Sequence, residues 1–517
     1  MPAREGDGHL FVVRGDLTRI ACDAVLIPSD SWLNVTGNWR SLLPAEHLAA
    51  SPYDEDWTTY VGPLSSSWPE GAGRVAESSH WLFIAATPEQ TARSVAASVR
   101  RALTTVAKQV HAGQRRVRPL VALPLAGTGE GGLTHRRGEV VDELLPTLRD
   151  AASDLNIDVA LVLRDRRDVA AVQAGRDAPE FWQSLPKDLY DVADELGERS
   201  ANRDLSLFLG AGVSTPLGLP DWPQLVADLR TLAGLPSVFD ADLETAAQEA
   251  LDELKGLLPT DLLERFVVTK CTLAHALLAG LELTQVVTTN YDTAYEAAVE
   301  GLAPDSVTPA LKVLTRMVVQ PPLPWLLKLH GDARTGRDIV LTRRQFARFA
   351  RSGNPLRGIV QTLLLTGHVL FIGSSLRDET FIRSARQVRT VLKTAEESRG
   401  WLGTVVPVFR DEDLRVRCGK ELLYRPMPYD ADQDDSGARM LEIFLDRLAW
   451  TAAMARHDAW EYLMDPRYAG VERLAEDDAV RELAQRMLDG ATPEVRSSKA
   501  WRVLADALQR LGADTGR

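Results

Sequence analysis

Short apolar segments rich in β-branched residues alternate with helical stretches over most of this chain, and this alternation constrains the fold more than any other feature. It is typical of parallel sheets covered by helices, so we predict an α/β protein. The segments fall into two blocks, and helical spacing occurs inside the first block at Thr91–Ala112 and Gly138–Leu155. The strands predicted in the first block are His9–Arg14, Ala24–Pro28, Trp81–Ala85, Leu120–Leu125 and Val159–Leu163. Those predicted in the second block are Leu205–Leu209, Gln285–Thr288, Trp325–Leu329, Val369–Ile372 and Thr404–Phe409.

The chain of 517 residues is too long for one hydrophobic core, because single cores stop growing at about 250–300 residues. A charged cluster at Arg164–Asp168 and a predicted helix at Leu189–Arg199 separate the two blocks. After the acidic stretch Asp432–Asp435, apolar residues recur at helical spacing from about Ser436 onward. We predict an N-terminal α/β domain at 1–178, a central α/β domain at 179–430 and a helical C-terminal region at 431–517.

Composition limits the classes of partner and compartment. The net charge is −13, with no basic run, so binding to a nucleic-acid backbone is not expected. The three cysteines, Cys22, Cys271 and Cys418, form no CxxC pair, which argues against a structural zinc site and a disulfide framework. The N-terminus lacks an apolar stretch of signal-peptide length, and no run approaches the roughly 20 apolar residues that span a bilayer. We therefore expect a cytoplasmic protein that does not enter membranes.

The first strand of the second block runs directly into Gly210-Ala211-Gly212-Val213-Ser214. Two glycines at this place let the backbone approach a pyrophosphate, and the N-terminus of a following helix would offer free N–H groups to the anion. The third glycine is displaced from the usual spacing of a dinucleotide-binding motif. Taken alone, the pair is equally typical of a tight turn in which one glycine adopts a positive φ.

Three more strands of this block end on polar residues and glycines. The ends are Thr288-Thr289-Asn290-Tyr291-Asp292, Lys328-Leu329-His330-Gly331-Asp332 and Gly373-Ser374-Ser375-Leu376. Ligands of open parallel sheets bind beyond the carboxyl ends of the strands, and a purely structural sheet has no need of polar residues at all four ends. The pattern therefore predicts one shared ligand pocket.

These motifs, in this order and together with Gly218-Leu219-Pro220-Asp221-Trp222, resemble the sirtuin superfamily. The resemblance covers about Ala178 to Asp430 and is closest to the sirtuin-like domains of bacterial antiphage defence proteins. It implies a central Rossmann-like parallel sheet with a helical insertion at Trp222–Glu282, and NAD as the substrate.

The resemblance also implies residue roles. Gly210 and Gly212 would face the pyrophosphate, Ser374 would touch the adenosine ribose, and Asp221 and Trp222 would border the nicotinamide pocket. Asn290 would hold the ribose or a water, Asp292 the carboxamide, and His330 would act as the base. The predicted NAD-binding set is completed by Ala211, Ser214 and Gly373. Alternatively, Ser214 and Ser374 cap local turns, and Trp222 and His330 are ordinary structural residues.

The chemistry of NAD cleavage suits these residue types. Nicotinamide leaves as a neutral molecule, so the reaction needs a stabilised oxocarbenium-like centre and a nucleophile rather than a general acid. An amide such as Asn290 can position water, and an imidazole such as His330 can accept its proton. Classical sirtuin deacylases carry two CxxC pairs and an Arg after the Trp, whereas this chain has no such pairs and has Pro223. We therefore expect NAD hydrolysis to nicotinamide and ADP-ribose, without a metal. The alternatives are a deacylase or ADP-ribosyltransferase, and a non-catalytic nucleotide-binding scaffold.

The first block resembles a macro domain, the fold that binds ADP-ribose. A Gly15-Asp16-Leu17-Thr18 turn follows its first strand, and a glycine loop, Ala126–Gly132, follows Leu120–Leu125. The resemblance implies that Asp16 meets the adenine amine and that Gly127, Thr128 and Gly129 wrap a phosphate. The usual glycine-rich substrate loop is replaced by Ser31–Gly37, so an α/β domain that binds nothing is the alternative.

A freely running NAD hydrolase would kill its own cell, so we expect regulation. The hypothesis is that the first domain binds an ADP-ribose-like signalling nucleotide or a separately encoded defence partner and thereby releases the hydrolase. In antiphage defence, the family pattern is abortive infection by draining NAD. The C-terminal helices either build a homo-oligomer or cap their own domain.

Overall fold

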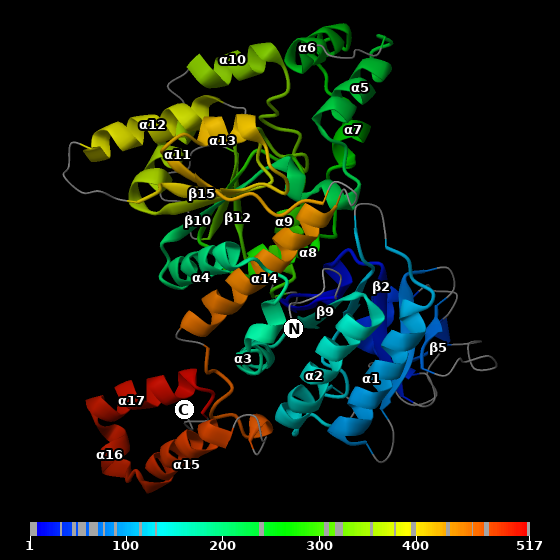
Figure 1. The fold of residues 1–517 in the computed structure, drawn as a ribbon, viewed down its shortest axis with the longest axis vertical. Helices are drawn as coiled ribbons and strands as arrows, with labels where there is room; N and C mark the ends of the chain where they lie inside the picture. The colour runs from blue at the N-terminus through cyan, green and yellow to red at the C-terminus, as the bar shows by residue number, and fades with distance from the viewer. Residues whose placement is uncertain are drawn as a thin grey trace.

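The computed structural model describes two large sheets, a small third sheet, and the helices that cover and connect them (Figure 1). The described residues are 8–30, 34–43, 48–49, 58–61, 71–75, 78–86, 90–112, 116–129, 132–236, 242–303, 310–315, 324–351, 355–376, 379–393, 400–430, 435–456, 459–469 and 475–513. Of the sequence-based predictions, Ser31, Trp32, Leu33, Glu130, Gly131 and most of the acidic stretch 432–435 lie outside these residues.

The first sheet has six strands in the order β1-β9-β8-β2-β7-β6, and every neighbouring pair is parallel except β6 with β7. Helices α1 and α2 pack side by side against it (Figure 1). The strands are β1 Leu10–Arg14, β2 Ala24–Asp30, β6 Gly73–Arg74, β7 His80–Ala86, β8 Leu120–Leu123 and β9 Asp158–Leu163; the helices are α1 Ala92–Ala107, α2 Arg137–Leu155 and α3 Arg166–Ala174. A small antiparallel sheet contains β3 Asn34–Thr36, β4 Leu48–Ala49 and β5 Thr58–Val61.

The second sheet has seven strands in the order β12-β13-β11-β10-β14-β15-β16, and all neighbouring pairs are parallel. The strands are β10 Leu205–Leu209, β11 Gln285–Thr288, β12 Lys312–Leu314, β13 Trp325–Lys328, β14 His368–Ile372, β15 Gly403–Val406 and β16 Leu422–Tyr424. The α/β fold predicted from the alternating segments is confirmed, and β10 and β11 have the predicted bounds. The edge strands β12 and β16 were not predicted.

Helices cover both faces of the second sheet, and its residues divide between two hydrophobic clusters. Leu207, Leu209 and Val286 pack in the cluster shared with the first sheet, whereas Phe208 and Val287 pack in a separate cluster with α11 and α12. This alternation follows from the two-residue period of a strand. The covering helices are α4 Lys187–Ala201, α8 Leu273–Gly280, α9 Ala294–Glu300, α11 Pro355–Thr366, α12 Glu379–Lys393 and α13 Glu412–Cys418.

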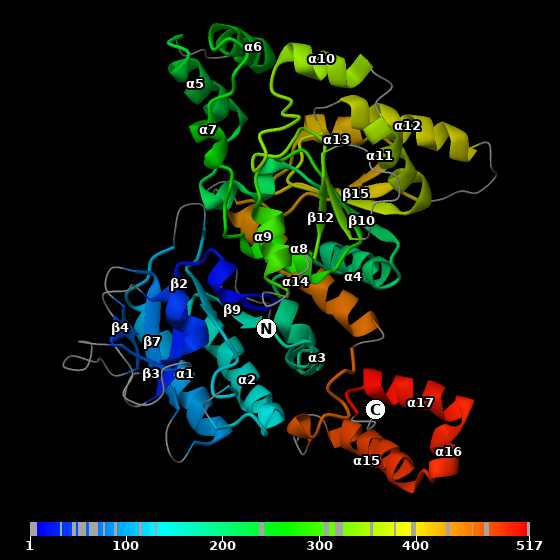
Figure 2. The ribbon, with the colours of Figure 1, turned by 180° about the vertical axis from the view of Figure 1, so that it is seen from behind.

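The predicted helical insertion divides into two parts. Helices α5, α6 and α7 form their own hydrophobic cluster and project beyond the sheet together with α10 (Figure 2), whereas α8 belongs to the layer that covers the sheet. Their bounds are α5 Trp222–Leu232, α6 Leu243–Glu253, α7 Thr260–Glu264 and α10 Arg343–Arg351.

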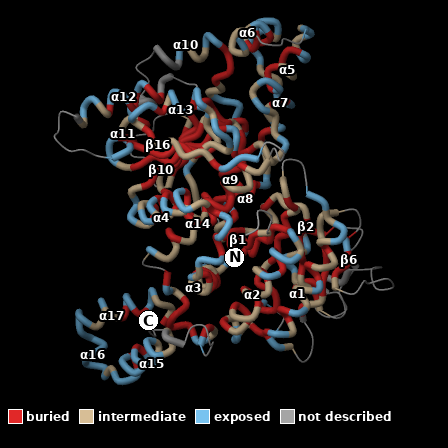
Figure 3. Tube along the Cα trace, in the orientation of Figure 1, coloured by how far each residue is buried: buried red, intermediate tan, exposed pale blue. Residues whose placement is uncertain are grey.

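Helix α14, Ser436–Ala455, lies between the two sheets, where it contacts α4, α8, α3 and β1. Its fully buried Asp446 accepts hydrogen bonds from His9 Nε2 at 2.9 Å and Trp182 Nε1 at 3.1 Å, and it forms an ion pair with the buried Arg176. The start of the C-terminal region therefore packs on its own chain. The helices α15 Ala475–Gly490, α16 Pro493–Ser497 and α17 Lys499–Arg510 are mostly exposed (Figure 3).

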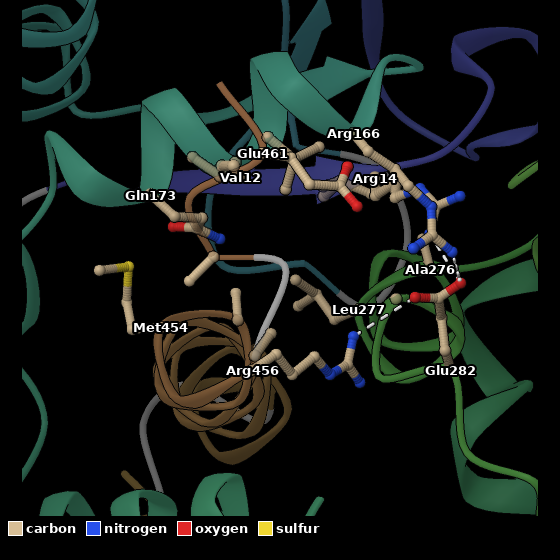
Figure 4. Close-up of a pocket in the computed structure, with 17 residues that line it drawn as sticks. Val12, Arg14, Arg166, Gln173, Ala276, Leu277, Glu282, Met454, Arg456 and Glu461 are labelled. Carbon is tan, nitrogen blue, oxygen red and sulfur yellow. Dashed lines mark hydrogen bonds and ion pairs between the residues drawn. The ribbon is translucent and has the colours of Figure 1, made fainter. Parts of the chain in front are cut away.

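A junction of about 70 Å³ lies where β1, α3, α8 and α14 meet. There Glu282 faces three arginines from other segments (Figure 4). It pairs with Arg14 at 2.8 Å, with Arg456 at 3.4 Å and with Arg166. Residues far apart in the sequence thus share one carboxylate at the contact between the two sheets. No described helix combines the length and hydropathy needed to cross a bilayer.

Candidate functional site

A cavity of about 1090 Å³ opens at the carboxyl edge of the second sheet. Its volume lies slightly above the usual range for small-molecule sites, about 300–1,000 Å³, and suits a ligand as large as a dinucleotide. The strand register explains why the predicted motifs meet there, since Leu209 lies opposite Thr288 and Ile372, and Thr288 lies opposite Lys328. The predicted residues among its lining are Ala211, Gly212, Ser214, Asp221, Trp222, Asn290, Asp292, His330 and Ser374.

Gly210 and Gly373 lie just outside this lining, where the first and fourth strand ends touch. A Cβ on Gly210 would lie 2.4 Å from the carbonyl oxygen of Gly373, and one on Gly373 would lie 2.6 Å from the amide nitrogen of Val213. The Gly212 amide donates to the Gly373 carbonyl at 3.0 Å. These glycines therefore let two backbone segments approach each other directly beneath the cavity.

The turn after β10 differs from both sequence-based interpretations. Gly210 has a φ of −110°, and the positive φ, +66°, occurs at Gly373 instead. Two 3₁₀ turns, Ala211–Val213 and Thr215–Leu217, follow the first glycine, so the helix predicted at this point is a short 3₁₀ turn and not an α-helix. Gly218 ends the second turn in the left-handed region, and the next α-helix, α5, begins only at Trp222.

Asn290 is buried and joins the ends of β10 and β11. Its Nδ2 donates to the Gly210 carbonyl at 3.1 Å and to Ser214 Oγ at 3.4 Å, and its backbone N–H donates to Thr288 Oγ1 at 3.0 Å. The carbonyl can only accept, which fixes the orientation of the amide. Asn290 Oδ1 is buried without a hydrogen-bond donor among the described residues. A buried acceptor of this kind is normally satisfied, so a ribose hydroxyl or a water fits there.

His330 contributes an imidazole that lines the cavity and is only 9% exposed. Its ring packs edge-on against Phe346 with centroids 5.2 Å apart, and its carbonyl accepts from the Val340 amide at 2.9 Å. Gly331 follows with a φ of +97°, and a Cβ there would lie 2.6 Å from the Asp338 backbone. The His-Gly pair therefore needs its glycine to make this turn.

The remaining predicted lining residues also have structural roles. Asp221 caps α5 by accepting from the Gln224 amide at 2.9 Å, and Asp292 accepts from the Ala294 amide at 3.0 Å. Trp222 packs edge-on against Phe346 with centroids 6.3 Å apart. Ser374 Oγ accepts from the Leu376 amide at 3.3 Å, whereas the Ser214 side chain makes no capping bond. Asp221, Asp292 and Ser374 therefore stabilise their own loops at the same time as they line the cavity.

Lys328 belongs to the motif Lys328–Asp332, but no functional role was predicted for it. The side chain is fully buried and pairs with Glu296 at 2.6 Å and with Asp332 at 3.1 Å. A lysine at the end of an otherwise apolar strand was the available signal. Among the described residues, no three His, Cys, Asp or Glu side chains lie close enough together to hold a metal ion.

The residues predicted to sense a ligand lie at the carboxyl edge of the first sheet. Asp16 accepts from the backbone N–H and the hydroxyl of Thr18, both at 2.9 Å. Gly127 has a φ of +80°, buried Thr128 donates to the Leu125 carbonyl at 2.8 Å, and Gly129 is exposed. The macro-like assignment and these ligand roles stay predictions.

The chain after Asp16 also contacts the second sheet's helices. Ile20 forms a parallel bridge with Cys271, and Arg19 pairs with Glu300 at 2.9 Å. Two backbone hydrogen bonds, from Cys271 to Arg19 and from Ala21 to Cys271, flank the bridge. The predicted sensing edge is therefore in direct contact with segments that lead to the cavity.

Comparisons with known proteins match this central region. Residues 284–417 match the SIR2-like domain, which confirms the sirtuin-like prediction. The chain is 29% identical to the NAD(+) hydrolase ThsA of Enterococcus faecium over 36% of this chain and 40% of that protein. It is 27% identical to Defense-associated sirtuin 2 of Bacillus subtilis, over 44% and 23% respectively, and 26% identical to the NAD(+) hydrolase ThsA of Bacillus cereus (strain MSX-D12), over 39% and 42%. These matches span less than half the length of each relative.

Proposed function

We propose that this chain, whose residues 284–417 match the SIR2-like domain, hydrolyses NAD to nicotinamide and ADP-ribose. The observation that carries the proposal is the shared cavity, in which Asn290 and His330 from neighbouring strand ends line a space of dinucleotide size. Three relatives named as NAD(+) hydrolases support the same reaction.

The residues suit the chemistry of hydrolysis. Asn290 Oδ1 accepts a hydrogen bond from a ribose hydroxyl or from the attacking water. The bond between ribose C1′ and the nicotinamide nitrogen breaks, and its electron pair neutralises the pyridinium. Water adds to C1′, and His330 takes the proton that the water loses. Asp221 and Trp222 border the nicotinamide, and the segment Ala211–Ser214 with Ser374 faces the rest of the dinucleotide.

The biological role follows from the toxicity of the reaction. We propose a cytoplasmic antiphage effector that drains NAD in abortive infection, as the relative named Defense-associated sirtuin 2 suggests. The first domain would hold the enzyme inactive until it binds an ADP-ribose-type nucleotide or a defence partner. The contacts of Arg14 with Glu282 and of Ile20 with Cys271 supply a physical link for this control. The exposed C-terminal helices would serve a homo-oligomer.

The test is incubation of the purified chain with NAD, with and without ADP-ribose-type nucleotides, followed by chromatography of the products. Nicotinamide and free ADP-ribose are expected, and Asn290→Ala and His330→Ala should each lower the rate at least 100-fold. The matched controls are Asn202→Ala and His111→Ala, since both side chains are exposed. An acetyl group on ADP-ribose from an added acyl-peptide would identify a deacylase. NAD binding without turnover in every condition would identify a scaffold.

A further inference from the structure

Lys328 is the last residue of β13 and ends in the interior of the protein. Its side chain is fully buried, although the other residues of the strand, Trp325–Leu327, are apolar. An ammonium group loses its hydration when it is buried, and an apolar side chain of similar length would fill the space without this cost. Simple packing therefore does not explain a lysine here.

The contacts of the ammonium group span two of the strand ends that form the cavity. On the β11 side, Nζ donates to the carbonyls of Asp292 at 2.7 Å and Tyr291 at 3.3 Å. On the β13 side, it pairs with Asp332 Oδ1 at 3.1 Å. A third contact, with Glu296 Oε1 at 2.6 Å, ties it to α9.

These contacts flank the two residues assigned to the chemistry. Asn290 directly precedes the Tyr291 and Asp292 carbonyls that Lys328 binds, and His330 lies between Lys328 and Asp332. The Ala333 amide donates to the Tyr291 carbonyl at 3.1 Å, which joins the same two segments a second time. Lys328 therefore links the loop that carries Asn290 to the loop that carries His330 through its charged ammonium group, and this link is called the tie below.

We propose that Lys328 is a positioning residue that holds Asn290 and His330 at the spacing NAD cleavage requires. The inference rests on the proposed hydrolase function. It assigns no contact with the substrate to Lys328, which is absent from the cavity lining. Loss of the tie would change the distance between the two side chains more than it would change the volume in which NAD binds.

The variant Lys328→Met removes the ammonium but leaves the buried carboxylates of Glu296 and Asp332 unpaired, which endangers the fold. The triple variant Lys328→Met/Glu296→Gln/Asp332→Asn keeps the shape and removes the charges together. We expect it to fold, with kcat for NAD lowered about 100-fold and KM changed less than about threefold, since misplacement of a reacting group by about 1 Å costs this much. The double variant Glu296→Gln/Asp332→Asn retains the lysine and its bonds to the Tyr291 and Asp292 carbonyls, and its melting temperature is measured first because the buried ammonium loses both carboxylates. We expect the folded double variant to recover at least tenfold of the lost kcat.

Hydrogen–deuterium exchange gives a readout independent of activity. In the triple variant, peptides that span 289–294 and 329–334 should exchange faster than in the native chain, whereas the control Lys312→Met, an exposed lysine on β12, should change neither exchange nor kcat. A folded triple variant with native exchange in both peptides, or with kcat within threefold of the native value, would overturn the proposal. A native chain that does not cleave NAD would instead remove the hydrolase function, while exchange would still test the tie.

Discussion

The close approach of Gly210 to Gly373 makes Gly210→Ala a sharp test of the cavity's geometry. The new Cβ would lie 2.4 Å from the Gly373 carbonyl oxygen and 2.6 Å from Ser374 Cα, both backbone atoms. Ordinary contact begins at 3.4 Å, so the two loops must separate by about 1 Å. Overpacking of this kind costs roughly 1–3 kcal/mol, and misplacement of reacting groups by about 1 Å costs about 100-fold in rate. Because Asn290 Nδ2 donates to the Gly210 carbonyl, the displacement reaches the proposed catalytic amide directly.

The assay is kcat/KM for NAD measured beside the melting temperature. We expect kcat/KM to fall about 100-fold, while Tm falls by only about 5 °C, since each kcal/mol moves Tm by about 2–4 °C in a domain of 150–250 residues. The control Gly234→Ala has a φ of +68° and no atom within 4 Å of the new Cβ. Because residue 234 has a left-handed backbone, this variant should lose about 1 kcal/mol of the free energy of unfolding, and its kcat/KM should stay at the native value. Native kcat/KM in Gly210→Ala would refute the idea that this loop contact sets the geometry of the site.

Three further predictions concern the interior and the junction. Burial lowers the pKa of His275 and of His368 to about 4. Because both histidines protonate more readily in the unfolded chain, the free energy of unfolding is unaffected above pH 6.5 and falls as the pH drops toward 4, by roughly 3 kcal/mol for each histidine. Guanidinium midpoints that do not change between pH 7.5 and 4.5 would contradict this. Asp446→Asn breaks the buried pair with Arg176 and should lower Tm by about 10 °C in scanning fluorimetry, from a cost of roughly 3–5 kcal/mol; a drop below about 3 °C would count against it. Glu282→Gln leaves three arginines at the junction without their shared carboxylate, and it should raise the rate of NAD hydrolysis in the absence of an activator. Unchanged basal and stimulated rates would show that this junction takes no part in the regulation.

The central strands and the meeting of the motifs could be predicted because both depend on local sequence. Val and Leu runs bounded by polar residues located β10, β11 and β14 closely, and the rule that parallel strands share a carboxyl edge brought Asn290 and His330 to one cavity. Strand direction places these residues at one edge of the sheet, and the strand order makes β11 and β13 neighbours.

The features that could not be predicted depend on contacts between distant segments. Strands β12 and β16 have three residues each, too few for a period to be visible, and they exist because a neighbouring strand offers an edge. Position 210 requires glycine because Gly373 lies against it, and the local sequence does not reveal that these two residues are close together. Likewise, Lys328 is ordinary in sequence and becomes informative only when its buried carboxylate partners are known.

Helix α8 offers a physical route from the junction to the cavity. Glu282 follows this helix closely, and near the other end Thr272 Oγ1 donates to the Val213 carbonyl at 3.4 Å. His275, one turn further along, lies in the electrostatic field of the cavity residue Asp292. Release of Glu282 from its arginines would free one end of an eight-residue helix whose other end contacts the loop after β10 through Thr272. A ligand shifts such an equilibrium only by its difference in affinity for the two arrangements. Under the proposed regulation, the activating ligand must bind the first domain more tightly when Arg14 has left Glu282 than when the pair is intact. The factor by which the ligand favours the open arrangement equals the factor by which that arrangement favours the ligand, so Glu282→Gln should bind the ligand more tightly than the native chain by this factor.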